Sequence, residues 1–150
     1  MKWRSTSLIV IGLLISGQLM REGRTNPPVH SDVAAPTDVT RALRRACYDC
    51  HSNETVWPWY SKVAPFSWLT NHEVDEGRLR LNFSEWDEYA SDPDTAAQKL
   101  SEIAHLVANG SMPPWYYRTL HSSARLSAAQ TDMLARWAEH QTTAYQSAPR

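Results

Sequence analysis

The chain has 150 residues, and its 15 basic and 16 acidic side chains give a formal net charge of −1. Hydrophobic residues make up 42% and charged residues 21%, which fits one folded domain and excludes a disordered chain. Without a basic excess, nucleic-acid binding through phosphate contacts is not expected. Two cysteines are too few for a disulfide scaffold or a four-cysteine zinc site.

Residues 1–24 are predicted to form a signal peptide or a membrane anchor. Lys2 and Arg4 precede an apolar run over residues 8–20, which is typical of an export segment. The run is shorter than the roughly 20 residues of a full membrane span, and no Ala-x-Ala cleavage site follows it. We expect a retained anchor, with a cleaved signal as the alternative. Either one places residues 25–150 outside the cytoplasm.

A short linker is predicted over residues 25–36, because Asn26-Pro27-Pro28 begins a stretch without periodicity. We expect it to hold the domain off the membrane. The domain itself is predicted over residues 37–141, followed by a C-terminal tail over residues 142–150.

The first predicted helix spans residues 38–50, with Thr37 or Asp38 as its cap. Its apolar residues recur at helical spacing, and the set includes both cysteines: Val39, Ala42, Leu43, Ala46, Cys47 and Cys50. The next segment, residues 52–66, is rich in proline and aromatic residues and is predicted to be a loop.

Further helices are predicted from periodicity and from capping residues. Asp92 and Pro93 suit a helix start, and Gly110 suits a helix end. Ser127 and Gln130 match a capping box. The predicted helices span residues 67–80, 93–109 and 128–141, with a short helical turn started by Ser84 over residues 82–89 and a loop over residues 111–117. No strand pair is evident, so the fold class is all-α.

The motif Cys47-Tyr48-Asp49-Cys50-His51 carries the main functional signal. Cys-x-x-Cys-His is the attachment signature of c-type haem. Two thiols at i and i+3 of a helix can both reach the vinyl groups on one edge of a porphyrin, and the next residue, His51, then supplies the proximal nitrogen to the iron. One covalent haem c is therefore expected.

Two other interpretations of the cysteine pair remain open at this stage. A thioredoxin-like redox pair begins a helix in a βαβ context, whereas this pair ends a predicted helix. A zinc site needs further ligands, for example His72.

Met112 is the first candidate for the sixth iron ligand, because it lies in a loop stiffened by Pro113 and Pro114. His72 is the second candidate. Methionine ligation raises the reduction potential relative to two histidines, whereas an open sixth site permits gas or peroxide chemistry. The wall of the haem pocket is expected to come from aromatic side chains: Trp57, Trp59, Tyr60, Trp68 and Trp115.

Several motifs in order resemble the bacterial haem-binding domain family. They include residues 46–55 around the cysteine motif, Trp57-Pro58-Trp59-Tyr60-Ser61, Glu76-Gly77-Arg78, Leu81–Trp86 and Met112-Pro113-Pro114. The resemblance covers about residues 1–140 and implies a small, usually membrane-anchored protein with one c-type haem. More loosely, the order of motifs is similar to class I cytochromes c.

These observations predict a monohaem c-type cytochrome that relays single electrons at the periplasmic face of the inner membrane. It is not expected to be an enzyme. The alternatives are a haem enzyme or gas or redox sensor with an open or displaceable sixth site, and a haem subunit of a larger membrane redox complex. Eight acidic residues fall between Glu73 and Asp94; they form either a solvated face or a docking surface for a basic partner.

Overall fold

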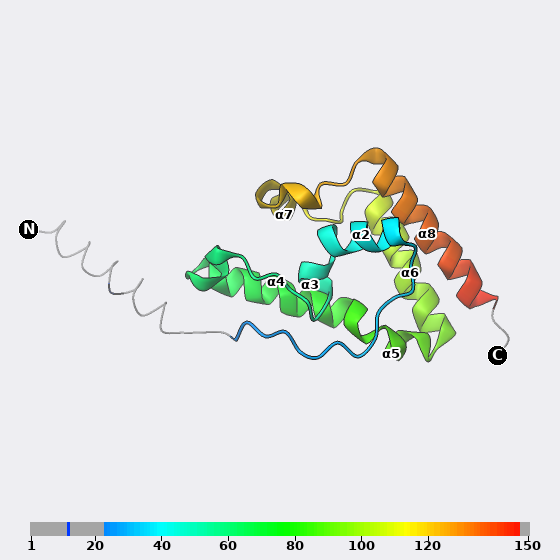
Figure 1. Ribbon diagram of the computed structural model, residues 1–150, viewed down its shortest axis with the longest axis horizontal. Helices are drawn as coiled ribbons and strands as arrows, with labels where there is room; N and C mark the ends of the chain where they lie inside the picture. Colours follow the sequence, from blue (N-terminus) through cyan, green and yellow to red (C-terminus); the bar gives the residue numbers. More distant parts are fainter. Residues whose placement is uncertain (1–11, 13–22, 148–150) are drawn as a thin grey trace, which may run out of the picture.

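The computed structural model describes residue 12 and residues 23–147, and within that part every regular element is helical (Figure 1). The predicted export segment lies almost wholly outside the described residues. Within them, no helix combines the length and the apolar character needed to cross a membrane. The elements are α2 (Thr37–Ala46), α3 (Tyr48–His51), η1 (Trp59–Lys62), α4 (Phe66–Arg80), η2 (Phe83–Glu85), α5 (Trp86–Ala90), α6 (Pro93–Ala108), α7 (Trp115–Leu120), η3 (Ser122–Ala124) and α8 (Ala128–Gln146).

The core lies where α2 packs on the pair formed by α6 and α8 (Figure 1). Leu43, Leu100 and Leu134, one from each helix, are completely buried there. Burying such side chains stabilises a domain by about 1.5–3 kcal/mol each. The apolar stripes predicted for these helices therefore face one another, and the all-α prediction is confirmed.

Local capping chemistry sets the ends of the two long core helices. Asp92 accepts a hydrogen bond from the Asp94 amide, and Gly110 after α6 has a φ of 74°, a left-handed conformation that favours glycine. Ser127 and Gln130 form the predicted capping box of α8. That helix continues beyond residue 141 to Gln146, because Tyr145 packs on the core and its hydroxyl accepts a hydrogen bond from the Trp86 indole at 3.3 Å.

The structure differs from the sequence prediction at the first helix and in the predicted loop over residues 111–117. The first predicted helix breaks at Cys47, whose φ of −125° separates α2 from α3. Its N-cap is Pro36, without a side-chain hydrogen bond, because Thr37 and Asp38 are already helical. The helix α7 occupies part of the predicted loop over residues 111–117; Pro114 directly before it supplies a favourable start.

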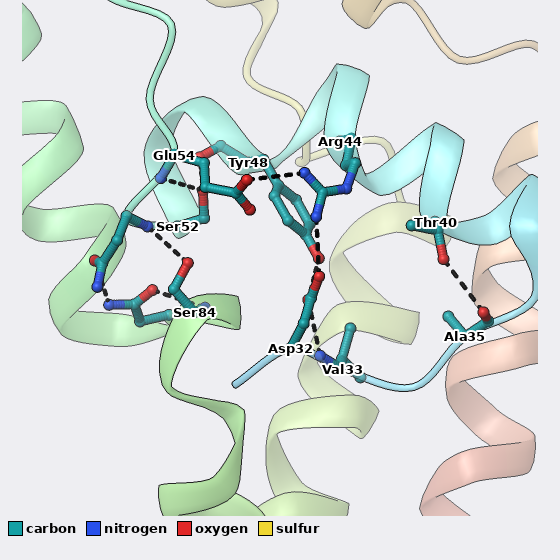
Figure 2. A network of polar contacts seen from close by, with 11 residues as sticks. Asp32, Val33, Ala35, Thr40, Arg44, Tyr48, Ser52, Glu54 and Ser84 are labelled. Atoms are coloured by element: carbon teal, nitrogen blue, oxygen red, sulfur yellow. Dashed lines mark hydrogen bonds and ion pairs between the residues drawn. The ribbon is translucent and has the colours of Figure 1, made fainter. Parts of the chain in front are cut away.

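The predicted linker has no helix, but it packs along the domain and is not a free spacer (Figure 2). The amides of His30 and Ser31 donate to the carbonyl of Ser84 at 2.9 and 3.1 Å, and Val33 is buried. Asp32 accepts hydrogen bonds from Tyr48 and from Arg44. Residues 25–36 are thus a strap that is held on the domain by hydrogen bonds.

The Tyr48–Asp32 hydrogen bond predicts how stability depends on pH. Burial and the hydrogen bond to Asp32 raise the pKa of Tyr48 above its usual value of about 10. Deprotonating Tyr48 is therefore harder in the folded state, so its stabilising contribution is complete below about pH 10 and is lost as the pH rises further. Tyr48→Phe should lower the unfolding free energy by about 1–2 kcal/mol at neutral pH and should flatten its decline above pH 10. Urea titrations at several pH values measure both effects, and an unchanged alkaline slope would contradict the assignment.

Candidate functional site

The cysteine motif lies at the joint between α2 and α3. The amides of Cys50 and His51 both donate to the carbonyl of Cys47, at 3.2 and 2.9 Å. This single turn brings the three side chains of the motif together. The amide of Cys47 donates to the carbonyl of Leu43 in α2. The turn that carries the motif therefore follows directly on the last turn of α2.

The motif is held against α4 at a position where only glycine fits. A Cβ atom added to Gly77 would lie 2.4 Å from the carbonyl oxygen of Cys50 and 3.0 Å from its Cβ atom. Contacts this short require the backbone of one helix to move. Gly77 therefore permits the close approach of α4 to the motif.

His51 is oriented by the last turn of α4. Its Nδ1 lies 2.9 Å from the Gly77 carbonyl and 3.1 Å from the Leu81 carbonyl. Since carbonyls only accept, Nδ1 carries the proton and Nε2 is left as the basic nitrogen. Burial lowers the pKa of His51, and the two carbonyls oppose that effect only in part. The ring is therefore a neutral imidazole, the form that binds a metal.

A cavity of about 520 Å³ opens in front of the motif. This volume lies within the range of about 300–1,000 Å³ that is typical of ligand sites. Cys47, Cys50, His51 and Met112 all line it, so the structure brings together the four residues predicted to bind the cofactor and its iron. The backbone amide of Met112 donates to the Leu106 carbonyl at 3.0 Å, which fastens the methionine loop to α6.

The cysteine thiols are held in their protonated form. Burial raises the pKa of Cys47 to about 12, with a smaller contribution from Cys50. Burial, followed by Asp49 and Glu73, raises the pKa of Cys50 to about 12. Reactive redox cysteines have a lowered pKa, so the redox-dithiol interpretation loses support. As for zinc, no three His, Cys, Asp or Glu side chains within residues 23–147 gather in an arrangement that could hold a metal ion.

The predicted pocket aromatics divide into two groups. Tyr60 lines the cavity, whereas Trp57, Trp59, Trp68 and Trp115 are not among its lining residues. Trp57 instead donates to Asn26 in the strap at 3.1 Å. Trp59 and Trp115 are 77% and 71% exposed. The second candidate for the sixth ligand, His72, is exposed on α4 and also does not line the cavity.

Some lining residues escaped the sequence analysis. Tyr117 and His121 stack with their ring centroids 4.1 Å apart, and Tyr117 donates to Asp49 at 2.6 Å. Tyr60 lies 3.1 Å from Nε2 of His121. The i, i+4 spacing of Tyr117 and His121 on a helix was the available signal, but residues 111–117 read as a loop.

Two cations also reach the cavity. Arg80 pairs with Glu76 at 3.5 Å, and Lys99 donates to the Arg80 carbonyl at 2.7 Å. Both can pair with carboxylate groups of a ligand. Arg78, by contrast, stabilises the fold. It donates hydrogen bonds to the carbonyl of Ser52 at 2.8 Å and, in the strap, to the carbonyl of Thr25 and the side chain of Asn26.

The residues present fit a haem. The cavity has the volume of a ligand site, and two thiols and a neutral imidazole lie on its wall. A family model described as haem-binding domain matches residues 6–140. Comparisons with curated proteins and with solved structures give no match. The match spans most of the chain, and the chain therefore belongs to the haem-binding domain family.

Proposed function

We propose that this protein is a monohaem c-type cytochrome that relays single electrons outside the cytoplasm, with His51 and Met112 as the two axial ligands. The observation that carries the proposal is the convergence of Cys47, Cys50, His51 and Met112 on one cavity. Membership of the haem-binding domain family supports the cofactor. Covalent attachment, electron transfer and the ligand pair are parts of the proposal.

Cys47 and Cys50 would hold the haem by thioether bonds to its two vinyl groups. Each bond would result from net addition of one S–H group across one vinyl double bond, so that nothing would be released. The turn at Cys47 holds both thiols on one wall of the cavity, and the protonated thiols are the form consumed in this addition. When bound, haem supplies the one-electron chemistry; the protein supplies the ligands, their orientation and a largely apolar site.

Met112→Ala tests the proposed sixth ligand. In haem-loaded protein we expect the weak sulfur-to-iron absorption band to disappear, the reduction potential to fall and carbon monoxide to bind more readily, because a methionine sulfur stabilises ferrous iron. Oxidised and reduced optical spectra measure the first effect. Met133→Ala is the matched control, because Met133 packs beside the core on α8 and does not line the cavity.

Two other results would redirect the proposal. An unchanged low-spin spectrum in Met112→Ala would assign the ligand to a histidine, and His121 is then the first to replace, because it lines the cavity whereas His72 does not. A high-spin wild type that binds carbon monoxide would favour the enzyme or sensor alternative. Polar groups for such chemistry are present in the cavity, where Tyr60 and His121 are hydrogen-bonded.

We further propose that the N-terminal segment anchors the protein to the periplasmic face of the inner membrane. The support is the basic and apolar order of residues 1–24 together with the need of c-type haem attachment for an exported chain. Its partners would be redox proteins, or the other subunits of a membrane redox complex. Co-purification from detergent-solubilised membranes distinguishes a free carrier from such a subunit.

A further inference from the structure

Exposed apolar side chains gather at one end of the molecule, around η1, the start of α4 and α7. We call this surface the aromatic face and define it by Trp59, Val63, Phe66, Trp115 and Leu120, which are 77%, 42%, 56%, 71% and 67% exposed. Exposed apolar clusters of this kind mark surfaces that contact another protein or a membrane.

Two polar contacts link the segments that carry the aromatic face. Tyr116 of α7 donates to Glu73 of α4 at 2.7 Å, and Tyr60 of η1 lies 3.1 Å from His121 after α7. Phe66 and Leu120 also line the cavity, so a bound haem covers part of their surface. Trp59, Val63 and Trp115 do not line it, and their exposure therefore needs another explanation.

The chain enters the domain at this same end. Arg24 donates to the carbonyl of Ser61 in η1 at 2.7 Å, and Asn26 donates to the carbonyl of Thr55 at 3.0 Å. The described chain thus begins next to η1, which carries part of the aromatic face.

The segments that carry the aromatic face contain cations but no carboxylates of their own. Residues 55–70 and 111–121 contain Lys62 and Arg118 and no aspartate or glutamate. The neighbouring carboxylates of Glu73 and Asp49 accept hydrogen bonds from Tyr116 and Tyr117 of α7. Arg24 adds a third cation nearby. Tryptophan and tyrosine beside lysine and arginine are the residue types that favour the interfacial layer of an anionic bilayer.

We infer that the aromatic face lies on the lipid bilayer, so that the part of the haem cavity lined by Phe66 and Leu120 is held at the membrane surface. This inference rests on the proposed anchor. Trp59 and Trp115 enter the headgroup layer, and Arg24, Lys62 and Arg118 contact anionic headgroups. A protein partner is less favoured, because the chain that leads to the anchor leaves from this face.

Spin labels on the full, haem-loaded chain test the inference. Trp59→Cys and Trp115→Cys place a label on the aromatic face, and Glu139→Cys places one on the exposed side of α8 as the control. Each variant is reconstituted into vesicles of phosphatidylcholine with a minority of phosphatidylglycerol. Electron paramagnetic resonance then measures how accessible each label is to oxygen, which concentrates in lipid, and to a water-soluble nickel complex.

We expect the ratio of oxygen to nickel accessibility to be raised at positions 59 and 115 relative to position 139, and to fall toward the control value when detergent replaces the vesicles. Equal ratios at all three positions in vesicles would overturn the inference and would leave the face to a protein partner.

Three further measurements distinguish an error in the membrane inference from an error in the proposed function. Wild type taken through the same labelling stays unlabelled if Cys47 and Cys50 are bonded to haem. The optical spectrum reports the axial ligands of each variant. Flotation of the protein with the vesicles reports the anchor, and an unanchored chain that still gave the raised ratios would support the face alone.

Discussion

Gly77→Ala should push α4 away from the cysteine motif and lower both stability and haem incorporation. The added Cβ would meet the backbone carbonyl of Cys50 at 2.4 Å, and a carbonyl in a helical turn cannot rotate aside as the end of a long side chain can. Overpacking of this kind costs about 1–3 kcal/mol or more, against a gain of about 1 kcal/mol in helix propensity. We expect a net loss of up to about 2 kcal/mol in unfolding free energy.

The same displacement would disturb the ligand. Gly77 and Leu81 hold Nδ1 of His51, so a shift of α4 turns the ring away from the orientation set by these carbonyls. Covalent haem per mole of protein and urea unfolding measure the two effects. Gly110→Ala is the control: its φ of 74° makes alanine cost about 1–2 kcal/mol there, yet no atom lies within 4 Å of the added Cβ atom. If the two variants carried equal amounts of haem, the argument for close approach would be wrong.

The domain should be largely unfolded when haem is not attached. Without haem, a cavity of about 520 Å³ would be left open to water between the helices that line it. A typical domain has only about 5–15 kcal/mol of stability with which to tolerate such a loss of packing. The helices around the cavity, α3, α4 and α7, would lose the surface against which they pack, whereas the α6–α8 pair keeps its own contacts.

Circular dichroism and urea titration check this expectation. The full chain without haem, made either as Cys47→Ala with Cys50→Ala or as wild type without a haem-attachment system, should show reduced helix content and no cooperative transition. The haem-loaded wild type is the reference. A cooperative transition with full helix content in both haem-free samples would show that the cavity is tolerated without its cofactor.

Much of the fold follows from local chemistry, and such features were predictable. Asp92, Gly110 and the Ser127–Gln130 box act within one helical turn of the ends they set. The break at Cys47 and the helix α7 depend instead on tertiary packing around the cavity. The positions of this break and of α7 could not be derived from periodicity, because the residues that line a ligand cavity do not recur at a fixed spacing along the chain.

The functional site likewise has a part that the sequence predicts and a part that it does not. The cysteine motif is defined by spacing alone, and the structure places its three functional residues on one cavity with Met112. The pocket aromatics were chosen by residue type, and type does not distinguish a cavity wall from a surface: Tyr60 lines the cavity, whereas Trp59 and Trp115 face outward beside it. Lys99 donates a hydrogen bond to the carbonyl of Arg80, nineteen residues earlier in the chain. No local sequence pattern indicates this contact.

The strap fixes how far the domain can travel. If the strap and the two residues before it, residues 23–36, formed a free chain, they would span up to about 50 Å. A domain on such a tether could reach distant partners. Hydrogen bonds from Arg24, Asn26 and Ser31 bind these residues along the domain instead, so that they add little to its reach. If the proposed anchor and electron-carrier role hold, the haem would stay at one fixed height above the membrane, and donor and acceptor would have to reach that height by diffusing in the plane of the membrane.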